Sequence, residues 1–455
     1  MIIAEKLGEM SENLSFKDLS IDAIHAAKQR LLDTIGCIIG GYNGESSKIV
    51  RNLIISLEEK GKSSILLEGV KTSARNATLV NGVMARILDF NDVYCGLTAT
   101  HPNEPVIPAA LAVGEEREVS GKELITAIIL GYEFDMRLAD IVPEIGNRGF
   151  SETATMGQYI TPIVASRLMG LNGKQIANAI GICGCHNVAL GGVWYGEVSM
   201  TKQIMNAFPA QSGVFAAQLA EKGFTGPRKI IEGEKGFCQV IVGTCEISKL
   251  IEELDENYKI SDSWIKAYPC CLRSHSAIDA ILSLVNENNL IPKDVWEVVV
   301  RTYRIAAEEV SGPAKIAPST ISQAQFSMHY CLANAIKERK VTTDQFSHDK
   351  LRNQETLKLA SKVRVKIDPE MDKIYPERWP AIVEISTADG RKLKKQVDFQ
   401  KGHNRNPLTD EEIKEKFRSL VLDTLSEEKT EDIITFIYSL EKRNNVSQLM
   451  EIVKG

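Results

Sequence analysis

The stretch Asp89–Pro108 concentrates ionisable and backbone-bending residues between two apolar, helix-like segments. Asp89 closes an apolar pattern with the spacing of one helix face, and the next helix is predicted to start near Pro108. His101 lies between them, in a loop that Pro102 and Pro105 stiffen. An acid at a helix end and a histidine in a stiff loop can face one space, which suits proton transfer. The simpler interpretation is that Asp89 caps the helix and His101 is an ordinary loop histidine.

Two further segments carry side chains that can hold a carboxylate or move a proton. Lys202, in MTKQIMNAFPAQSG (200–213), precedes a helical segment and could bind a substrate carboxylate, or act as acid or base if desolvated. His275, in YPCCLRSHSAIDA (268–280), comes just before an apolar helix, whose N-terminus disfavours a charged imidazole. A neutral histidine is what a general base requires. A solvated surface lysine and a histidine that only caps a turn are the alternatives.

Arginine and glycine residues suggest further ligand contacts. Arg148, in RGFSETATMG (148–157), could pair with a carboxylate through two hydrogen bonds, although a surface arginine is the more ordinary interpretation. Gly191 and Gly192, in ALGGVWYGE (189–197), let the backbone approach a ligand closely. This segment lacks a dinucleotide motif, and GLNGK (170–174) lacks the rest of a phosphate loop. No nucleotide cofactor is therefore expected.

The nine cysteines have no regular spacing, which favours reduced thiols in a cytoplasmic protein. Cys183, Cys185 and His186 form the group CGCH, but it lies in an apolar, helical context without the C-x-x-C pairs of structural zinc. Buried or lining thiols are the better interpretation. We expect no metal site.

The bulk composition is that of a soluble globular protein. The chain has 455 residues, of which 44% are hydrophobic and 25% charged, so two domains are expected. A net charge of −6 gives no electrostatic case for nucleic acid, but a small anionic substrate needs only a local positive site. Glu5, Lys6 and Glu9 interrupt the N-terminal apolar run, and no uncharged run could cross a bilayer. We expect neither a signal peptide nor a membrane partner.

The elements that must position these residues fall into two groups. Apolar stripes at helical spacing fill the first half, whereas residues 296–305 and 361–368 have strand character and Asp389-Gly390 marks a hairpin. Thr409 and Glu412 form a capping box before a last helical stretch. The fold class is therefore mainly α with a smaller α+β domain. We expect a large all-helical, discontinuous domain (1–259 with 399–455) and an antiparallel-sheet domain (260–398).

The order of several motifs resembles the MmgE/PrpD family, which includes iron-independent 2-methylcitrate dehydratases, cis-aconitate decarboxylases and iminodisuccinate epimerases. The matching pieces span most of the chain: LLDTIGCIIGG, NGVMARILDFND, HPNEPVIPAALAVGE, AAQLAEKGFTGP with IIEGEKGF, YPCCLRSHSAIDA, AQFSMHY, DPE and NPLT. The resemblance implies a helical domain built from both chain ends, a smaller lid domain, a cleft between them and a homodimer. It also implies that no redox cofactor is used.

The resemblance supplies roles at matching positions. Asp89 and His101 look like the family's acidic residue and loop histidine, Lys202 like its lysine, and His275 like the histidine of the YP…H…ID motif. We expect these four to be catalytic.

Three positions depart from the family pattern. Val93 stands where cis-aconitate decarboxylases carry Thr, Ser151 where many members have His, and Met205 where the lysine segment often has His. We expect Ser151 to contact substrate, together with Arg148, Gly191, Gly192 and Arg273. These departures make decarboxylation less favoured.

The chemistry common to the family is proton movement at a carbon beside a carboxylate. The leading hypothesis is dehydration of a 2-methylcitrate-like hydroxy-tricarboxylate, with His101 and His275 as the acid–base pair and Asp89 orienting a histidine or raising its pKa. Lys202, together with Arg148 or Arg273, would neutralise developing charge. Epimerisation of an amino-dicarboxylate, decarboxylation of cis-aconitate and a noncatalytic carboxylate-binding scaffold remain as alternatives.

Overall fold

The computed structural model describes residues 2–143, 145–186, 189–194, 199–243, 245–252, 254 and 257–454. Its internal contacts divide the chain into two units. The helical unit comprises Met1–Ile87, Asn91–Trp264 and Thr409–Gly455, and the α+β unit comprises Leu88–Phe90 and Ile265–Leu408. The class expected from the sequence, mainly α with a smaller α+β domain, is confirmed.

The helical unit contains helices from both ends of the chain and two short β-hairpins. Its helices are α1 (Ile3–Asn13), α2 (Ile21–Gly40), α3 (Glu45–Ser56), α4 (Ala74–Arg86), α5 (Asn103–Glu116), α6 (Gly121–Ile141), α7 (Glu152–Leu168), α8 (Gly173–Gly184), α9 (Thr201–Ile204), α10 (Ala207–Glu221), α19 (Asp410–Val421), α20 (Glu427–Tyr438) and α21 (Ser447–Val453). The hairpins pair β1 (Ser63–Ser64) with β2 (Lys71–Thr72) and β3 (Tyr94–Cys95) with β4 (Ala99–Thr100).

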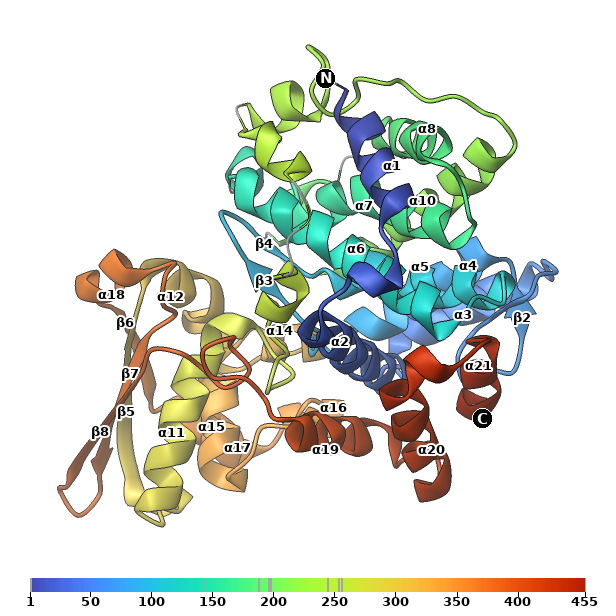
Figure 1. Ribbon diagram of the computed structural model, residues 1–455. Coiled ribbons are helices and arrows are strands. Elements are labelled where there is room, and N and C mark those ends of the chain that lie inside the picture. The colour runs from blue at the N-terminus through green and yellow to red at the C-terminus, as the bar shows by residue number, and fades with distance from the viewer. Residues whose placement is uncertain are drawn as a thin grey trace. The chain divides into compact units, whose positions relative to one another are not determined.

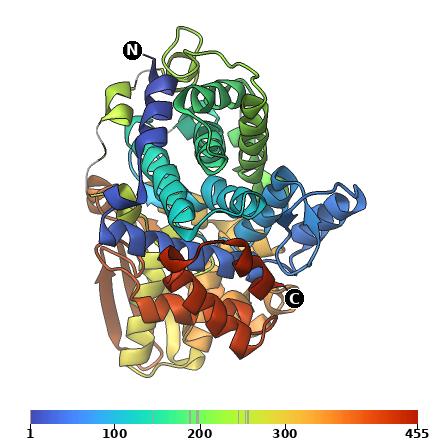
Figure 2. The ribbon, with the colours of Figure 1, turned by 45° about the vertical axis from the view of Figure 1, so that its right-hand side comes forward.

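Helix α19 packs against α2, and Figure 2 shows the red C-terminal helices beside the dark blue α2. A Cβ added at Gly36 would lie only 3.0 Å from the Phe417 ring, so the glycine permits this close approach. A buried ion pair of 2.6 Å joins Lys416 Nζ to Asp33 Oδ1 across the same contact. The predicted capping box is confirmed, because the Glu412 N–H donates to Thr409 Oγ1 and the Thr409 N–H to the Glu412 carboxylate.

The prediction that a helix starts near Pro108 is wrong. Helix α5 begins at Asn103, with Pro102 as its N-cap residue, and Pro108 lies inside it. Pro105 is the third residue of the helix, and proline is tolerated in this first turn because the N–H that it lacks has no helical partner there. The loop that carries His101 is therefore shorter than expected, and the histidine lies directly before α5.

The α+β unit combines a four-stranded sheet with short helices. Its elements are α11 (His275–Glu287), β5 (Val295–Thr302), α12 (Arg304–Val310), α13 (Pro313–Ile316), α14 (Ile321–Gln325), α15 (Met328–Glu338), α16 (His348–Leu351), α17 (Gln354–Ala360), β6 (Val363–Ile367), α18 (Pro369–Ile374), β7 (Ala381–Thr387) and β8 (Lys392–Val397). The strand order is β6-β5-β7-β8. The sheet is mixed rather than purely antiparallel, because β6 pairs with β5 in parallel.

Helices α11 and α15 cover one face of this sheet and contact each other (Figure 1). Ile281, Val298 and Leu332 are fully buried in the core that they form. The hairpin expected at Asp389-Gly390 joins β7 to β8, and Gly390 has a φ of 87°, which favours glycine. This core fixes the start of α11, where His275 lies.

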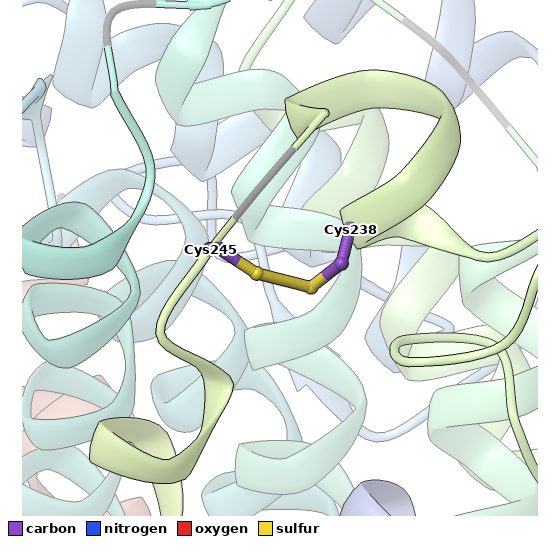
Figure 3. Close-up of a disulfide and its surroundings, with 2 residues drawn as sticks. All are labelled: Cys238 and Cys245. Atoms are coloured by element: carbon purple, nitrogen blue, oxygen red, sulfur yellow. A yellow bond between two sulfur atoms is a disulfide. The ribbon is translucent and has the colours of Figure 1, made fainter.

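Two observations bear on the cysteines and on membrane association. The expectation that all nine cysteines are reduced is wrong, since Cys238 and Cys245 form a disulfide (Figure 3). The other seven are not disulfide-bonded. Within the described part of the chain, no helix has the length and apolar character needed to cross a bilayer.

Candidate active site

His101 is held by two contacts within the helical unit. Its backbone N–H donates to Thr153 Oγ1 over 3.1 Å, and its ring Nδ1 lies 2.7 Å from the carbonyl oxygen of Asp92. A carbonyl can only accept a hydrogen bond, so Nδ1 carries the proton. In the neutral ring the basic lone pair is then on Nε2. The ring is fixed in the tautomer that a base acting through Nε2 requires.

Two buried carboxyl groups bind residues that flank this histidine in the sequence. Asp92 accepts from the Tyr132 hydroxyl over 2.5 Å and from the Asn103 N–H over 3.3 Å, and Asp135 accepts from the Thr100 hydroxyl over 2.8 Å. Burial raises the pKa of each carboxyl to about 7, although the Tyr132 and Thr100 hydrogen bonds oppose the shift. Both groups therefore change charge near neutral pH.

Lys202 lies in the short helix α9 and is only 2% exposed, so it is not a solvated surface lysine. One helical turn further on, Met205 Sδ lies 4.0 Å from Ser151 Oγ. Ser151 is the N-cap residue of α7, and Thr153 of the same first turn accepts from the His101 N–H. The start of α7 thus connects the surroundings of His101 with those of Lys202. Two positions that depart from the family pattern, Ser151 and Met205, contact each other.

The other residues predicted for the helical unit have mainly backbone contacts. The Arg148 guanidinium donates to the carbonyls of Ile241 over 2.6 Å and Val240 over 3.4 Å, inside the loop closed by the disulfide. The Gly191 N–H donates to the Gly149 carbonyl over 2.7 Å. A Cβ at Gly192 would meet no atom within 4 Å. Substrate contacts of these residues stay predictions, and positions 195–198 of the glycine-rich segment lie outside the described residues.

In the α+β unit, Asp89 is bound by a lysine. Asp89 has a φ of 51°, which is uncommon for a residue other than glycine, and it is 1% exposed. Lys266 Nζ lies 3.0 Å from its carbonyl oxygen and 3.3 Å from its carboxylate Oδ2. Lys266 is itself 2% exposed. Asp89 therefore belongs to a buried ion pair, which sequence reasoning did not anticipate.

His275 begins helix α11 and is fully buried. Its ring Nε2 lies 3.3 Å from the carbonyl oxygen of Cys270, and its centroid lies 5.1 Å from the ring of Tyr268 in an edge-on arrangement. These contacts orient the imidazole at the start of the helix.

Arg273 already pairs with an acidic side chain of its own unit. It forms an ion pair with Glu309, and Tyr375 Oη lies 3.4 Å from its Nη1. Its guanidinium carbon lies 5.4 Å from the centroid of the Trp379 ring. To bind a substrate carboxylate, as predicted, Arg273 would have to exchange or share Glu309.

Sequence reasoning missed Lys266, Asp92, Tyr132 and Thr153. Asp92 lies inside the quoted motif NGVMARILDFND, and Lys266 comes two residues before the YPCC motif, so both were close to recognised segments. Their partners are remote: Lys266 is 177 residues from Asp89, and Thr153 is 52 residues from His101. Periodicity within a segment does not identify such partners.

The fold and these contacts define a two-unit protein with buried ionisable side chains in each unit. The chain belongs to the MmgE/PrpD family: the family's N-terminal domain matches residues 5–249, and its C-terminal domain matches residues 268–442.

The chain is similar over its full length to proteins named for cis-aconitate decarboxylation. It is 26% identical to human cis-aconitate decarboxylase, over 100% of this chain and 95% of the relative. It is 23% identical to cis-aconitate decarboxylase of Aspergillus terreus, over 99% of this chain and 96% of the relative. A cis-aconitate decarboxylase-like protein of Aspergillus oryzae is 25% identical, with 96% and 94% covered.

Proposed function

We propose that this protein is a cofactor-independent lyase that moves a proton at a carbon beside a carboxylate of a small di- or tricarboxylate. The leading reaction is dehydration of a 2-methylcitrate-like hydroxy-tricarboxylate. The observation that carries the proposal is the 2.7 Å contact of His101 Nδ1 with the Asp92 carbonyl, because it gives a neutral His101 a basic Nε2. In the proposal the protein acts as a homodimer.

The reaction needs a base, an acid and a cation. His101 Nε2 takes the proton from carbon while the carbon–oxygen bond to the hydroxyl breaks, and the two carbons form a double bond. His275 is proposed as the acid: it must take up a proton before the reaction, against the preference of its buried position at a helix start for the neutral ring, and it gives that proton to the departing hydroxyl, which leaves as water. Lys202 offsets the negative charge that develops on the substrate carboxylate, and its burial strengthens that interaction.

Decarboxylation of cis-aconitate is a second candidate, favoured by the full-length similarity to proteins with that name. Three side chains argue against it. Val93 is buried and apolar, and Ser151 lies against Met205, so these positions lack the threonine and histidines of the pattern described above. We prefer dehydration to decarboxylation because dehydration requires only the acid, the base and the cation.

A substrate panel distinguishes the reactions. Chelator-treated protein is incubated in D2O with 2-methylcitrate, citrate, cis-aconitate and an iminodisuccinate, and unsaturated product, CO2 and carbon-bound deuterium are followed. We expect an unsaturated tricarboxylate from 2-methylcitrate without CO2. CO2 from cis-aconitate would favour the decarboxylase, and deuterium uptake without unsaturation would favour the epimerase.

Lys202→Met provides the matched test of the cation, since methionine has a similar length and no charge. We expect at least a ~100-fold loss of kcat, the scale of a lost charge-stabilising group. Lys174→Met in α8 is the control because that residue is exposed. Binding of all four compounds with no turnover of any would support the scaffold alternative.

A further inference from the structure

Asp92 holds the His101 segment through its main chain and through its side chain. Its carbonyl oxygen lies 2.7 Å from the His101 ring Nδ1, and its carboxyl oxygen Oδ1 accepts from the Asn103 N–H over 3.3 Å. Asn103 is the first residue of α5 and follows His101 by two positions. Asp92 therefore fixes both the imidazole and the start of the helix that comes after it.

The peptide bond between Asp92 and Val93 is held from its other side by Trp264. The Val93 N–H donates to the Trp264 carbonyl over 2.9 Å, and the Trp264 N–H donates to the Val93 carbonyl over 2.7 Å. The C=O and N–H groups of a planar trans peptide point in opposite directions. The bond from Val93 to Trp264 thus directs the Asp92 carbonyl toward His101.

The side chain of Asp92 is held by a tyrosine of α6. The Tyr132 hydroxyl donates to the second carboxyl oxygen, Asp92 Oδ2, over 2.5 Å. Tyr132 is fully buried, and Asp92 is 1% exposed. Because a buried polar group is costly to leave without its partner, this bond favours the Asp92 rotamer that reaches Tyr132. The same rotamer presents Oδ1 to the Asn103 N–H.

We propose that Tyr132 is a positioning residue that sets the tautomer of His101 through Asp92. The inference rests on the proposed function, in which His101 Nε2 is the base. The Tyr132 hydroxyl holds the Asp92 carboxyl, and the Asp92 carbonyl accepts the proton of Nδ1, so the basic lone pair stays on Nε2. When this support is lost, the other neutral tautomer, which carries its proton on Nε2, becomes populated and cannot act as the base there.

Ionisable groups of two helices face the Asp92 carboxyl. Burial raises the pKa of Asp92 to about 7, and the hydrogen bond from Tyr132 opposes that shift. Arg30 on α2 also opposes it, whereas Asp33 on α2 adds to it. Asp135 on α6 interacts with the Asp92 charge as well. Burial raises the pKa of Tyr132 well above its usual range, so its hydroxyl keeps its proton and can donate to either charge state of Asp92.

The test compares the His101 tautomer in wild type and in Tyr132→Phe. Both proteins are labelled with 15N at the histidine ring nitrogens and studied by NMR at a pH at which the ring is neutral, with His101→Asn used to assign the signals. We expect the wild-type ring to carry its proton on Nδ1 and the Tyr132→Phe ring to populate the Nε2-protonated form as well. A wild-type ring protonated on Nε2, or a Tyr132→Phe ring that stays protonated on Nδ1 alone, overturns the inference.

Steady-state kinetics with 2-methylcitrate supply a second measurement. We expect kcat of Tyr132→Phe to fall at least ~10-fold and KM to stay within about threefold, because the change affects the base and not substrate binding. Tyr438→Phe is the matched control, since that hydroxyl also donates to an aspartate of the helical unit, Asp410, over 3.1 Å. A purely structural tyrosine would lower the free energy of unfolding and leave the tautomer and kcat unchanged, as we expect for Tyr438→Phe.

The double variant Asp92→Asn/Tyr132→Phe covers the case in which Tyr132→Phe does not fold. Its amide cannot ionise, so loss of the hydroxyl leaves no buried charge without its donor. We expect the same mixture of tautomers, and a ring protonated on Nδ1 alone in the double variant would contradict the role of Tyr132. A tautomer change in a protein whose wild type turns over none of the four substrates upholds that role and contradicts the proposed function.

Discussion

The buried carboxyl groups of Asp92 and Asp135, which bind residues that flank His101, make the helical unit sensitive to pH. Burial raises the pKa of each to about 7, whereas an unfolded aspartate titrates near ~4. Between these values the folded state holds a proton that the unfolded state has released. The contribution to stability is thus fully present below about pH 4 and is lost as pH rises through about 7. Protonation of Asp92 and Asp135 is therefore linked to folding.

Asp135→Asn tests this linkage at one residue. The amide can accept from Thr100 as the neutral carboxyl does, but it cannot ionise. We expect the variant's gain in free energy of unfolding over wild type to grow from near zero at pH 4 to as much as about 4 kcal/mol above pH 7. Urea unfolding at pH 4.5 and pH 8 measures it. Asp432→Asn, an exposed change on α20, is the control, and equal gains at both pH values would contradict the linkage.

At the scale of elements, Glu104 of α5 gathers several buried groups into what we call the Glu104 cluster, with Arg86, Asn91 and Asn206. Asn91 Nδ2 donates to Oε1 and Asn206 Nδ2 to Oε2, each over 2.5 Å, and Arg86 Nε lies 3.3 Å from Oε1. Asn206 immediately precedes α10 and follows α9, which carries Lys202. The cluster therefore fixes the α9–α10 junction against the start of α5, directly after His101.

Asn206→Ala should loosen this junction. Loss of one donor to a buried carboxylate is expected to lower the free energy of unfolding by about 1–3 kcal/mol. Because α9 is adjacent, kcat should also fall, and more than substrate binding does. Gln211→Ala serves as the control. Gln211 lies on α10, and the change removes its part-buried hydrogen bond to Asn76 of α4. Equal kcat values in the two variants would show that the Glu104 cluster does not support the position of Lys202.

The elements themselves were largely predictable from the sequence. Ser20 and Thr409 mark helix starts through local side-chain bonds, and Asp389-Gly390 marks a hairpin, because these signals depend on neighbouring residues only. The start of α5 was misjudged because proline signals a loop in general but is compatible with a first helical turn. The parallel pairing of β6 with β5 was missed because alternation identifies a strand and not its neighbour.

For the whole molecule, the family and the fold class followed from motif order and composition, but the long-range contacts of the candidate site did not. Asp89 and His101 are close in sequence, yet Asp89 belongs to the α+β unit by its contacts and His101 to the helical unit. Lys266 had no periodic or motif signal that linked it to Asp89. The sequence therefore predicts candidate residues for the site. Their partners are long-range contacts, which only the folded structure shows.

The disulfide is a further property that spacing did not predict. If Cys238 and Cys245 are bonded, the denatured, unreduced protein has seven reactive thiols. Iodoacetamide labelling followed by mass spectrometry should then find seven adducts before reduction and nine after it. Nine adducts before reduction would restore the original expectation of reduced thiols.

The proposed reaction is acid–base lyase chemistry that uses His101. The most direct measurement is the rate of unsaturated product formation from 2-methylcitrate by chelator-treated wild type and by His101→Asn, with folding checked by urea unfolding. Asparagine keeps a side-chain donor to the Asp92 carbonyl but has no basic nitrogen. We expect product from wild type and a rate at least ~100-fold lower from a folded His101→Asn. Equal rates from the two proteins, or no product from wild type, would contradict it.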